Sequence, residues 1–273
     1  MSIKISVVTT VYNGQEYFDK SIPSILNQNY DSFEWIIVDD GSTDATPELL
    51  NKIATKDKRL KVLYCDRLGR AKALNHAIEN AQGQYIANQD FDDISYPERL
   101  QLQLEFLDSH PQVGIVGCNY LVEDEIRNQR YIRMPPNSHK LLMTRMAKCV
   151  PFAHTLATFR KEAWQQAGGY SEPNDLVDIR LWIKMAKLGW HLGSIPVTLG
   201  EHFIYSKSFW HKNFQYSQRQ KHLSKVQWQA IKELELPLWM GIYPLGRYIY
   251  CYSPKQIKSF LRRTVAGSKE QVM

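Results

Sequence analysis

The sequence lacks the features that mark several large classes of protein. Its cysteines are few and widely separated: Cys65, Cys118, Cys149 and Cys251. This spacing argues against a zinc site and a disulfide framework, and it is typical of a reducing compartment. No signal peptide precedes the first apolar run, and no apolar run is long enough to span a bilayer. We therefore expect a cytoplasmic protein without a membrane-spanning helix.

Acidic residues are scarce only toward the end of the chain. The net charge is +6 for all 273 residues, but +9 for the residues from 205 onward, which contain 12 Lys and Arg against 3 Asp and Glu. Such a tail suits nucleic acid or anionic lipid, although a solvated helical face is the commoner explanation. We expect no nucleic-acid partner, and we consider a peripheral contact at the inner face of the membrane.

Two common phosphate-binding motifs are also absent. No G-x-G-x-x-G follows the first apolar run, and no G-x-x-x-x-G-K-[ST] occurs. A Rossmann dinucleotide site and a P-loop are therefore disfavoured. A pyrophosphate bound to this chain would need another source of positive charge, and a divalent metal ion is the natural one.

Apolar runs and helical patterns alternate through the first part of the chain. This alternation predicts an α/β fold with a right-handed, mostly parallel sheet flanked by helices. Strands are predicted at 3–10, 33–38, 60–64, 85–87, 113–117 and 154–160, with an edge hairpin at 120–133. Helices are predicted at 17–26, 47–53, 69–80, 100–107, 137–146, 178–188 and 255–264.

Three carboxylates, Asp90, Asp92 and Asp93, follow the buried strand at 85–87. Their mutual repulsion is costly unless a cation is bound between them. Ligands of open α/β sheets bind at the carboxyl ends of the strands, where these acids lie. The stretch therefore predicts a divalent-metal site that holds phosphates. The competing explanation is a solvated acidic turn in which Asp93 or Ser95 caps the next helix.

Polar residues also end the first two predicted strands. Thr10 and Tyr12 end the first, and Asp39 and Asp40 end the second. The carboxyl ends of neighbouring parallel strands share one edge of a sheet. We therefore expect these residues to lie beside the acids, which strengthens the prediction of a metal and phosphate site.

Taken in order, the motifs resemble the family-two glycosyltransferases, which use nucleotide-diphosphate sugars on the Rossmann-like GT-A fold. The matching segments are SVVTTVYNG at 6–14, IVDDGSTD at 37–44, GQYIA at 83–87, DFDD at 90–93, PERL at 97–100, AGGY at 167–170 and LW at 181–182. The likeness spans about residues 3–200 and is specific as an ordered set. It implies a GT-A domain at 1–204, with a nucleotide-binding half at about 1–95 and an acceptor half at about 96–204. A basic, aromatic C-terminal extension follows at 205–273.

The resemblance also implies roles for the residues at the strand ends. Thr10, Tyr12 and Asp40, with Asp39 beside them, match positions that hold the nucleotide, often through uracil. The alternative for each of these residues is a purely structural role, as a cap at a strand end or as part of a turn.

The resemblance assigns the remaining acids to the metal and to catalysis. Asp90 and Asp92 match the D-x-D motif, in which the first acid lies near the ribose and the second ligates Mn²⁺ or Mg²⁺. Asp93 supports them or shares the metal. Asp178 matches the general base, and its alternative role is a helix N-cap.

Three positions depart from the family pattern. Val177 stands where the family has Glu, Arg180 where it has Asp, and Tyr205 where it often has His. His202 or His211 is a substitute for the last, although a lone His is more often structural.

The function implied by the resemblance is inverting transfer of a sugar from a nucleotide-diphosphate sugar, with UDP favoured, to a saccharide or lipid-linked acceptor. One base suffices for direct attack with inversion, and a cation stabilises the leaving diphosphate. One alternative, motivated by Val177 and Tyr205, is a catalytically inactive module that binds or assembles around nucleotide sugars. The other alternative is a sugar nucleotidyltransferase. It is disfavoured because residues 11–15 contain no glycine-rich or Lys/Arg-rich segment that would bind a triphosphate. The aromatic residues of the tail are suited to a membrane surface, a lid over the sheet or a homo-oligomer contact.

Overall fold

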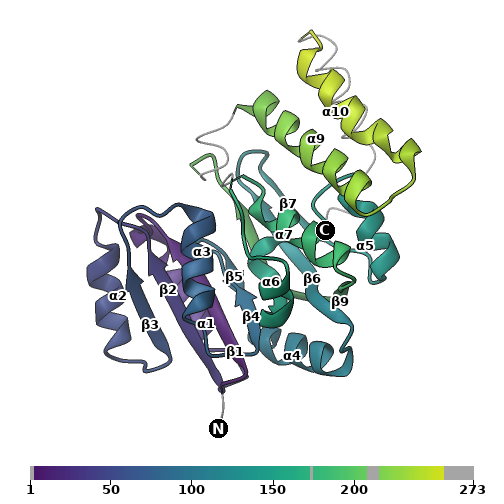
Figure 1. The fold of residues 1–273 in the computed structure, drawn as a ribbon. Helices are drawn as coiled ribbons and strands as arrows, with labels where there is room; N and C mark the ends of the chain where they lie inside the picture. Colours follow the sequence, from purple (N-terminus) through teal and green to yellow (C-terminus); the bar gives the residue numbers. More distant parts are fainter. Residues whose placement is uncertain (1–2, 173–174, 208–214, 255–273) are drawn as a thin grey trace.

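The computed structural model describes residues 3–172, 175–207 and 215–254, which fold into helices packed around one mixed sheet (Figure 1). Within these residues the sheet has nine strands in the order β3-β2-β1-β4-β8-β6-β9-β5, and β7 pairs with β6. The strands are β1 (Ile5–Val11), β2 (Phe33–Asp39), β3 (Leu60–Tyr64), β4 (Tyr85–Asn88), β5 (Ile94–Ser95), β6 (Val113–Asp124), β7 (Gln129–Arg133), β8 (Thr158–Arg160) and β9 (His191–Ile204).

The first four strands are parallel, as the sequence predicts. Alternate residues of β1 face opposite sides of the sheet, so Val8 packs in one core cluster with Leu74 and Val7 packs in the other with Phe18. The helices of this half are α1 (Phe18–Leu26), α2 (Thr46–Ala54), α3 (Arg70–Glu79) and α4 (Arg99–Ser109). Because both faces are covered, β1 and β2 are almost wholly buried and read as continuous apolar runs.

The second half of the sheet is mixed in direction. Strand β8 is antiparallel to both β4 and β6, whereas β9 runs parallel to β6. Strand β9 was not predicted, because its apolar pattern is interrupted by Gly193, Pro196 and Gly200. Pro196 lies where the register with β6 shifts, between the pairs Cys118–Ile195 and Asn119–Thr198. Proline is tolerated there because a bulge leaves a ladder position without a hydrogen bond.

The predicted strand at 154–160 is wrong in its first half. Residues His154–Leu156 form the 3-10 helix η2, and only β8 is extended. The Thr155 hydroxyl accepts a hydrogen bond from the Asp90 N–H at 3.0 Å, and the Leu156 carbonyl accepts one from the Gln103 side chain at 2.8 Å. These contacts turn the chain toward the acidic loop. The predicted hairpin at 120–133 is confirmed as β6–β7.

The remaining helices follow the second half of the sheet. They are α5 (His139–Met146), α6 (Lys161–Gln166), α7 (Val177–Lys187), α9 (Tyr216–Glu233) and α10 (Ile242–Tyr252), with a 3-10 turn η3 (Leu238–Gly241) before α10. Figure 1 shows α9 and α10 side by side as a hairpin beyond α5 and α7. The predicted helix at 255–264 lies outside the described residues. Among the helices that the structure describes, none combines the length and hydropathy needed to cross a bilayer.

Candidate active site

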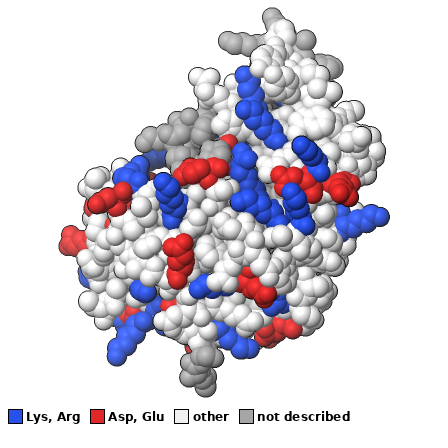
Figure 2. Space-filling view, viewed as in Figure 1, with Lys and Arg blue, Asp and Glu red and all other residues white. Residues whose placement is uncertain are grey.

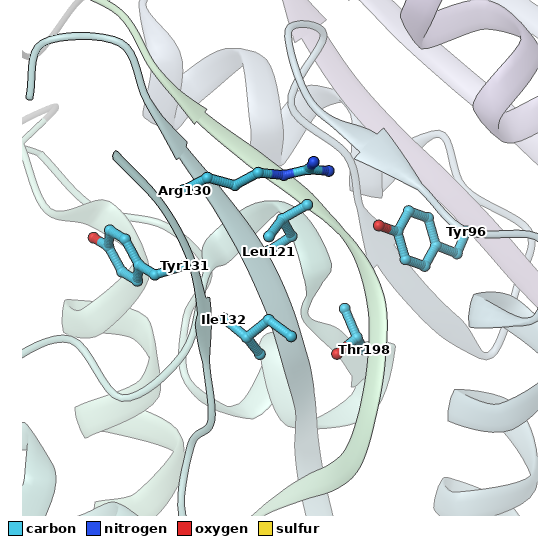
Figure 3. A pocket seen from close by; sticks show the side chains of 6 residues that line it. All are labelled: Tyr96, Leu121, Arg130, Tyr131, Ile132 and Thr198. Carbon is cyan, nitrogen blue, oxygen red and sulfur yellow. The ribbon is translucent and has the colours of Figure 1, made fainter. Parts of the chain in front are cut away.

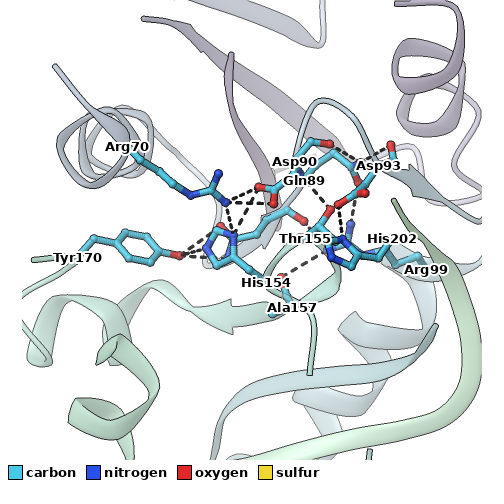
Figure 4. A network of polar contacts seen from close by, with 11 residues as sticks. Arg70, Gln89, Asp90, Asp93, Arg99, His154, Thr155, Ala157, Tyr170 and His202 are labelled. Atoms are coloured by element: carbon cyan, nitrogen blue, oxygen red, sulfur yellow. Dashed lines mark hydrogen bonds and ion pairs between the residues drawn. The ribbon is translucent and has the colours of Figure 1, made fainter. Parts of the chain in front are cut away.

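The acidic loop, residues 89–93, begins at the carboxyl end of β4, and Figure 4 shows its polar contacts. The Arg70 Nη2 atom, from the first turn of α3, donates to both Asp90 carboxylate oxygens at 2.8 and 3.0 Å. His154 Nδ1 lies 3.5 Å from the same carboxylate. Although burial raises it, the pKa of Asp90 is held well below its usual range by Arg70 and His154. Asp90 is therefore an ionised carboxylate that the protein itself neutralises.

His154 belongs to a wider set of buried polar contacts. Its Nδ1 atom lies 3.2 Å from Arg70 Nη2, and its Nε2 atom lies 2.9 Å from the Tyr170 hydroxyl. The same hydroxyl accepts a hydrogen bond from the Asn88 side chain at 3.0 Å. The contacts of Asp90 thus reach back into the sheet, because Asn88 is the last residue of β4.

Asp93 binds groups from β9. One of its oxygens lies 3.1 Å from His202 Nδ1, and the other accepts the Phe203 N–H at 2.8 Å. Burial alone disfavours a charged His202, but Asp93 and the other acids outweigh it and raise the pKa of His202 to about 9. His202 is therefore cationic at neutral pH and is part of the site. The side chain of Asp93 is thus used here and does not cap the next helix, which has no side-chain cap.

Asp92 differs from its two neighbours. Burial, followed by the charges of Asp93 and Asp90, raises the pKa of Asp92 to about 7, and the nearby His202 only partly opposes this. Within the described residues Asp92 takes part in no ion pair, unlike Asp90 and Asp93. A half-buried carboxylate whose charge is not balanced is suited to a hard cation. No group of three or more His, Cys, Asp or Glu in the described part of the chain has the arrangement of a complete protein-only metal site.

A buried arginine, Arg99, holds the backbone around the acidic loop through hydrogen bonds. Arg99 is fully buried and donates to the Gln89 side-chain oxygen at 3.1 Å, the Ser95 hydroxyl at 2.8 Å and the Asn88 carbonyl at 2.7 Å. Gln89 then donates to the carbonyl groups of Asp90 and Asp93 at 3.0 and 2.9 Å. Burial lowers the pKa of Arg99 to about 10, which still leaves it charged at neutral pH.

The predicted nucleotide-binding residues lie along the same edge of the sheet. The register pairs Thr10 with Val38 and Val11 with Asp39, so the ends of β1 and β2 lie side by side. The Tyr12 ring is exposed, and the Arg67 guanidinium lies 3.5 Å from its centroid.

The two acids at the end of β2 hold the loops around this edge. Asp39 accepts the Ser42 N–H at 2.9 Å. The Asp40 carboxylate accepts the Leu68 and Gly69 N–H groups at 2.5 and 3.0 Å, and so fixes the turn that precedes α3. Asp40 thus shapes the turn before Arg70, and Asp39 fixes the turn whose Ser42 hydroxyl accepts the Asn13 N–H at 2.8 Å, next to Tyr12.

Asp178 lies in the first turn of α7 and is not its N-cap, a position that Leu176 occupies. Asp178 is half-buried. Burial alone lowers the pKa of Arg70, but the charges of nearby acids raise it, with Asp90 contributing most, then Asp178 and then Asp92. The structure thus brings Asp178 close to the Asp90 end of the acidic loop.

Asp175, three residues before Asp178, has other partners. Asp175 is buried, with His222 Nδ1 at 2.5 Å and Arg180 Nη2 at 3.7 Å. Arg180, which stands where the family has an acid, is therefore used to hold Asp175. Val177 is buried in the core cluster that contains α7.

Sequence reasoning missed most of the partners of the acids. Arg70, His154 and Tyr170 come from three distant segments. Tyr170 ends the AGGY segment at 167–170, but no local pattern marks Arg70 or His154. Arg99 is part of the PERL segment at 97–100, but its partners were not predicted, although an arginine in a buried stripe of a helix is itself unusual. Of the two histidines considered, His202 lies at the site, and His211 lies outside the described residues.

A separate cavity of about 350 Å³ lies beside β6, β7 and β9 (Figure 3). It is lined by Tyr96, Leu121, Arg130, Tyr131, Ile132 and Thr198. The Tyr96 hydroxyl donates to Glu201 at 3.0 Å, and Glu201 precedes His202 on the strand. None of the described residues that line this cavity belongs to the acidic loop.

Comparison with known proteins finds a consistent set of similar chains. The model of the family "Glycosyl transferase family 2" matches residues 6–167. EpsE of Bacillus subtilis (strain 168), named as a glycosyltransferase, is 32% identical over 98% of this chain and 96% of its own length. AmsE of Erwinia amylovora, named as an amylovoran biosynthesis glycosyltransferase, is 30% identical over 71% of this chain and 74% of its own.

Solved structures with the same fold also match. A mannosyltransferase, PcManGT of Pyrobaculum calidifontis, in complex with GDP-Man and Mn²⁺, has a TM-score of 0.66 and 19% identity over 97% of this chain and 80% of its own. S. aureus TarS 1-349 in complex with UDP-GlcNAc has a TM-score of 0.63 and 16% identity over 94% of this chain and 83% of its own. The predicted GT-A fold is therefore confirmed.

Replacing Arg99 by leucine is expected to destabilise the fold. The change removes the Arg99 donor from the buried Asn88 carbonyl and one of two donors from the Gln89 side-chain oxygen, which keeps the Ser95 hydroxyl. An unsatisfied buried acceptor costs about 1–3 kcal/mol. We expect Arg99→Leu to lower the free energy of unfolding by about 2–4 kcal/mol, measured by urea titration with tryptophan fluorescence. The control is Arg130→Leu, whose side chain is 66% exposed in its pair with Glu123 and for which we expect a loss below about 1 kcal/mol. Equal losses in the two variants contradict the role of Arg99.

Proposed function

This chain belongs to glycosyl transferase family 2, and we propose that it transfers a sugar with inversion from a uridine diphosphate sugar to a saccharide or lipid-linked acceptor. The observation that carries the proposal is the unbalanced Asp92 carboxylate at the carboxyl edge of the sheet, with Asp178 close to the same loop. The Asp92 carboxylate is thus available to bind a cation, and the Asp178 carboxylate is available to take a proton from the acceptor.

The nucleotide is proposed to bind over the ends of β1 and β2. The exposed Tyr12 ring offers a flat surface for a base, and Arg67 already lies against that ring. Thr10 and Asp40 lie beside it, and Asp90 is proposed to approach the ribose. The TarS complex with UDP-GlcNAc supports a uridine nucleotide, whereas the GDP-Man complex of PcManGT shows that this fold also accepts guanosine.

A divalent cation, Mn²⁺ or Mg²⁺, is proposed to bind at Asp92, with the diphosphate supplying further oxygen ligands. When bound, it stabilises the negative charge that grows on the leaving diphosphate. The donor set fits, because carboxylate and phosphate oxygens are the ligands that Mg²⁺ prefers. Asp90 and Asp93 are predicted to share the metal. We propose that they also stabilise the loop, Asp90 through its ion pair with Arg70 and Asp93 through its ion pair with His202. Mn²⁺ in the PcManGT complex supports the choice of ion.

Asp178 is proposed to act as the general base. Its place at the start of α7 sets it near Arg70 rather than among the clustered acids. A base in this position removes the proton from the acceptor hydroxyl as that hydroxyl attacks the sugar directly. The neighbouring acid, Asp175, is buried against His222 and Arg180, so it is not the stronger candidate.

The acceptor is proposed to be a growing saccharide or its lipid-linked form. The name of AmsE as an amylovoran biosynthesis glycosyltransferase supports a place in polysaccharide assembly. A cytoplasmic site of action is consistent with a donor that is a soluble nucleotide sugar.

Replacing Asp92 by asparagine is expected to abolish metal-dependent donor binding. We expect wild-type protein to bind UDP in the presence of MnCl₂ and to lose that binding in excess chelator, as measured by titration calorimetry. Asp92→Asn removes the negative charge that attracts the ion and is expected to reduce affinity to the level seen without metal. The control is Asp31→Asn, whose side chain is 93% exposed and which is expected to bind normally. Unchanged metal dependence in Asp92→Asn rules out this ligand.

Replacing Asp178 by asparagine is expected to spare binding and to stop catalysis. The readout is the slow hydrolysis of UDP-sugars with Mn²⁺, in which water serves as the acceptor, and loss of a general base typically costs ~10²–10⁴ in rate. The affinity for UDP is expected to stay unchanged. Glu172→Gln, an exposed acid from the loop before α7, is the matched control. If Asp178→Asn hydrolyses the donor at the wild-type rate, Asp178 is not the general base. If the wild-type protein binds the donor but does not hydrolyse it, the result favours an inactive binding module.

A further inference from the structure

The helix α10 has its apolar side turned outward. Ile242, Leu245, Ile249 and Tyr252 are each about half exposed or more and recur every three or four residues, so they form one stripe along the helix. In the preceding turn η3, Leu238 is 85% exposed and Trp239 is 65% exposed, and they extend the stripe. These six residues are called the outer face.

The inner side of α10 buries the small Pro244 and Cys251 side chains and also holds polar contacts. Ser224 of α9 donates to the Pro244 carbonyl at 2.8 Å. The Arg247 side chain hydrogen-bonds the Gln227 side chain at 3.2 Å and the Lys148 carbonyl at 2.9 Å. A helix on the surface of a water-soluble domain normally buries its apolar stripe and exposes its polar one. Helix α10 instead exposes its apolar stripe, which points to a non-aqueous environment beyond the outer face.

The charge pattern of the sequence favours an anionic surface as that environment. Residues 236–254 contain no Asp or Glu, and the sequence that follows carries Lys255, Lys258, Arg262 and Arg263. Figure 2 shows the region around α10 as mostly white with scattered blue. Tryptophan and tyrosine favour the interface of a bilayer, and basic residues favour anionic headgroups.

Two lysines lie at the border of the outer face. Lys221 Nζ lies 4.6 Å from the centroid of the Tyr252 ring, and Lys148 Nζ lies 4.9 Å from that of Tyr243. In this position an ammonium group reaches the headgroup layer while the rings lie deeper. A second copy of the chain is a poorer occupant, because two such faces would bring the same positive charges together.

We propose that η3 and α10 form a binding surface for an anionic phospholipid bilayer, on which the helix lies in the plane of the interface. Eleven residues of α helix extend about 16 Å, which is only about half of the hydrocarbon core of about 30 Å. The face therefore dips into one leaflet and does not span it. Contact with a membrane does not depend on the proposed sugar transfer, although it would bring a lipid-linked acceptor to the enzyme.

The test is co-sedimentation of the full-length protein with vesicles, in the absence of any sugar donor. Vesicles of phosphatidylcholine alone are compared with vesicles that also contain phosphatidylglycerol, at low and at high salt. We expect binding to the anionic vesicles and a weaker signal at high salt. In the double variant Trp239→Ser, Ile242→Ser, we expect the bound fraction to fall at least ~10-fold, because the outer face loses two of its most exposed apolar side chains.

Two controls make the outcome decisive. Leu188→Ser, an exposed apolar residue after α7, is expected to bind vesicles like the wild type. The double variant is expected to keep the UDP affinity of the wild type, because both residues lie at the surface away from the acidic loop. Wild-type protein that stays in the supernatant with every vesicle overturns the proposal. So does equal binding by the double variant, or a wild-type dimer in ultracentrifugation that the double variant abolishes without any vesicle binding.

Discussion

The acidic loop depends on a buried cation, Arg99, that forms no ion pair with a carboxylate among the residues that the structure describes. The donors of Arg99 go to neutral oxygens, among them the Asn88 carbonyl and the Gln89 side chain. Gln89 then holds the carbonyl groups of Asp90 and Asp93 from below. Because the guanidinium is fully buried, its charge acts through a low local dielectric and offsets part of the repulsion among the acids above it. The loop is thus held in one shape before any ligand arrives.

The acids of the loop are balanced in different ways. Asp90 is paired with Arg70 from α3, and Asp93 is paired with His202 from β9. Among the described residues Asp92 has no such partner, and its pKa rises to about 7 as a result of burial and of the two neighbouring charges. A bound cation would relieve this cost, so the arrangement favours an ion at one specific carboxylate rather than a diffuse acidic patch.

Local patterns in the sequence predicted the frame of this site but not its partners. Burial on both faces produces continuous apolar runs, so β1 to β4 and their shared edge were predicted. The pair Asp90–Arg70 is separated by 20 residues and the pair Asp93–His202 by 109, and no local pattern encodes such contacts. The strand that carries His202 was missed because glycine and proline interrupt its alternation. Those interruptions coincide with a shift in register, which only the pairing with β6 explains.

Strand β9 also connects the proposed site to the C-terminal hairpin. His202 lies near its end, and the Tyr205 ring that follows stacks on Phe203, with 5.7 Å between the ring centroids. Burial raises the pKa of Tyr205, and the charge of Asp92 raises it further, so this residue lies beside the acidic loop. The chain then continues to α9 and α10. A bilayer held by α10 would therefore be connected to the proposed site through the chain that continues from this strand, and a lipid-linked acceptor would be concentrated on the same surface to which the enzyme is bound.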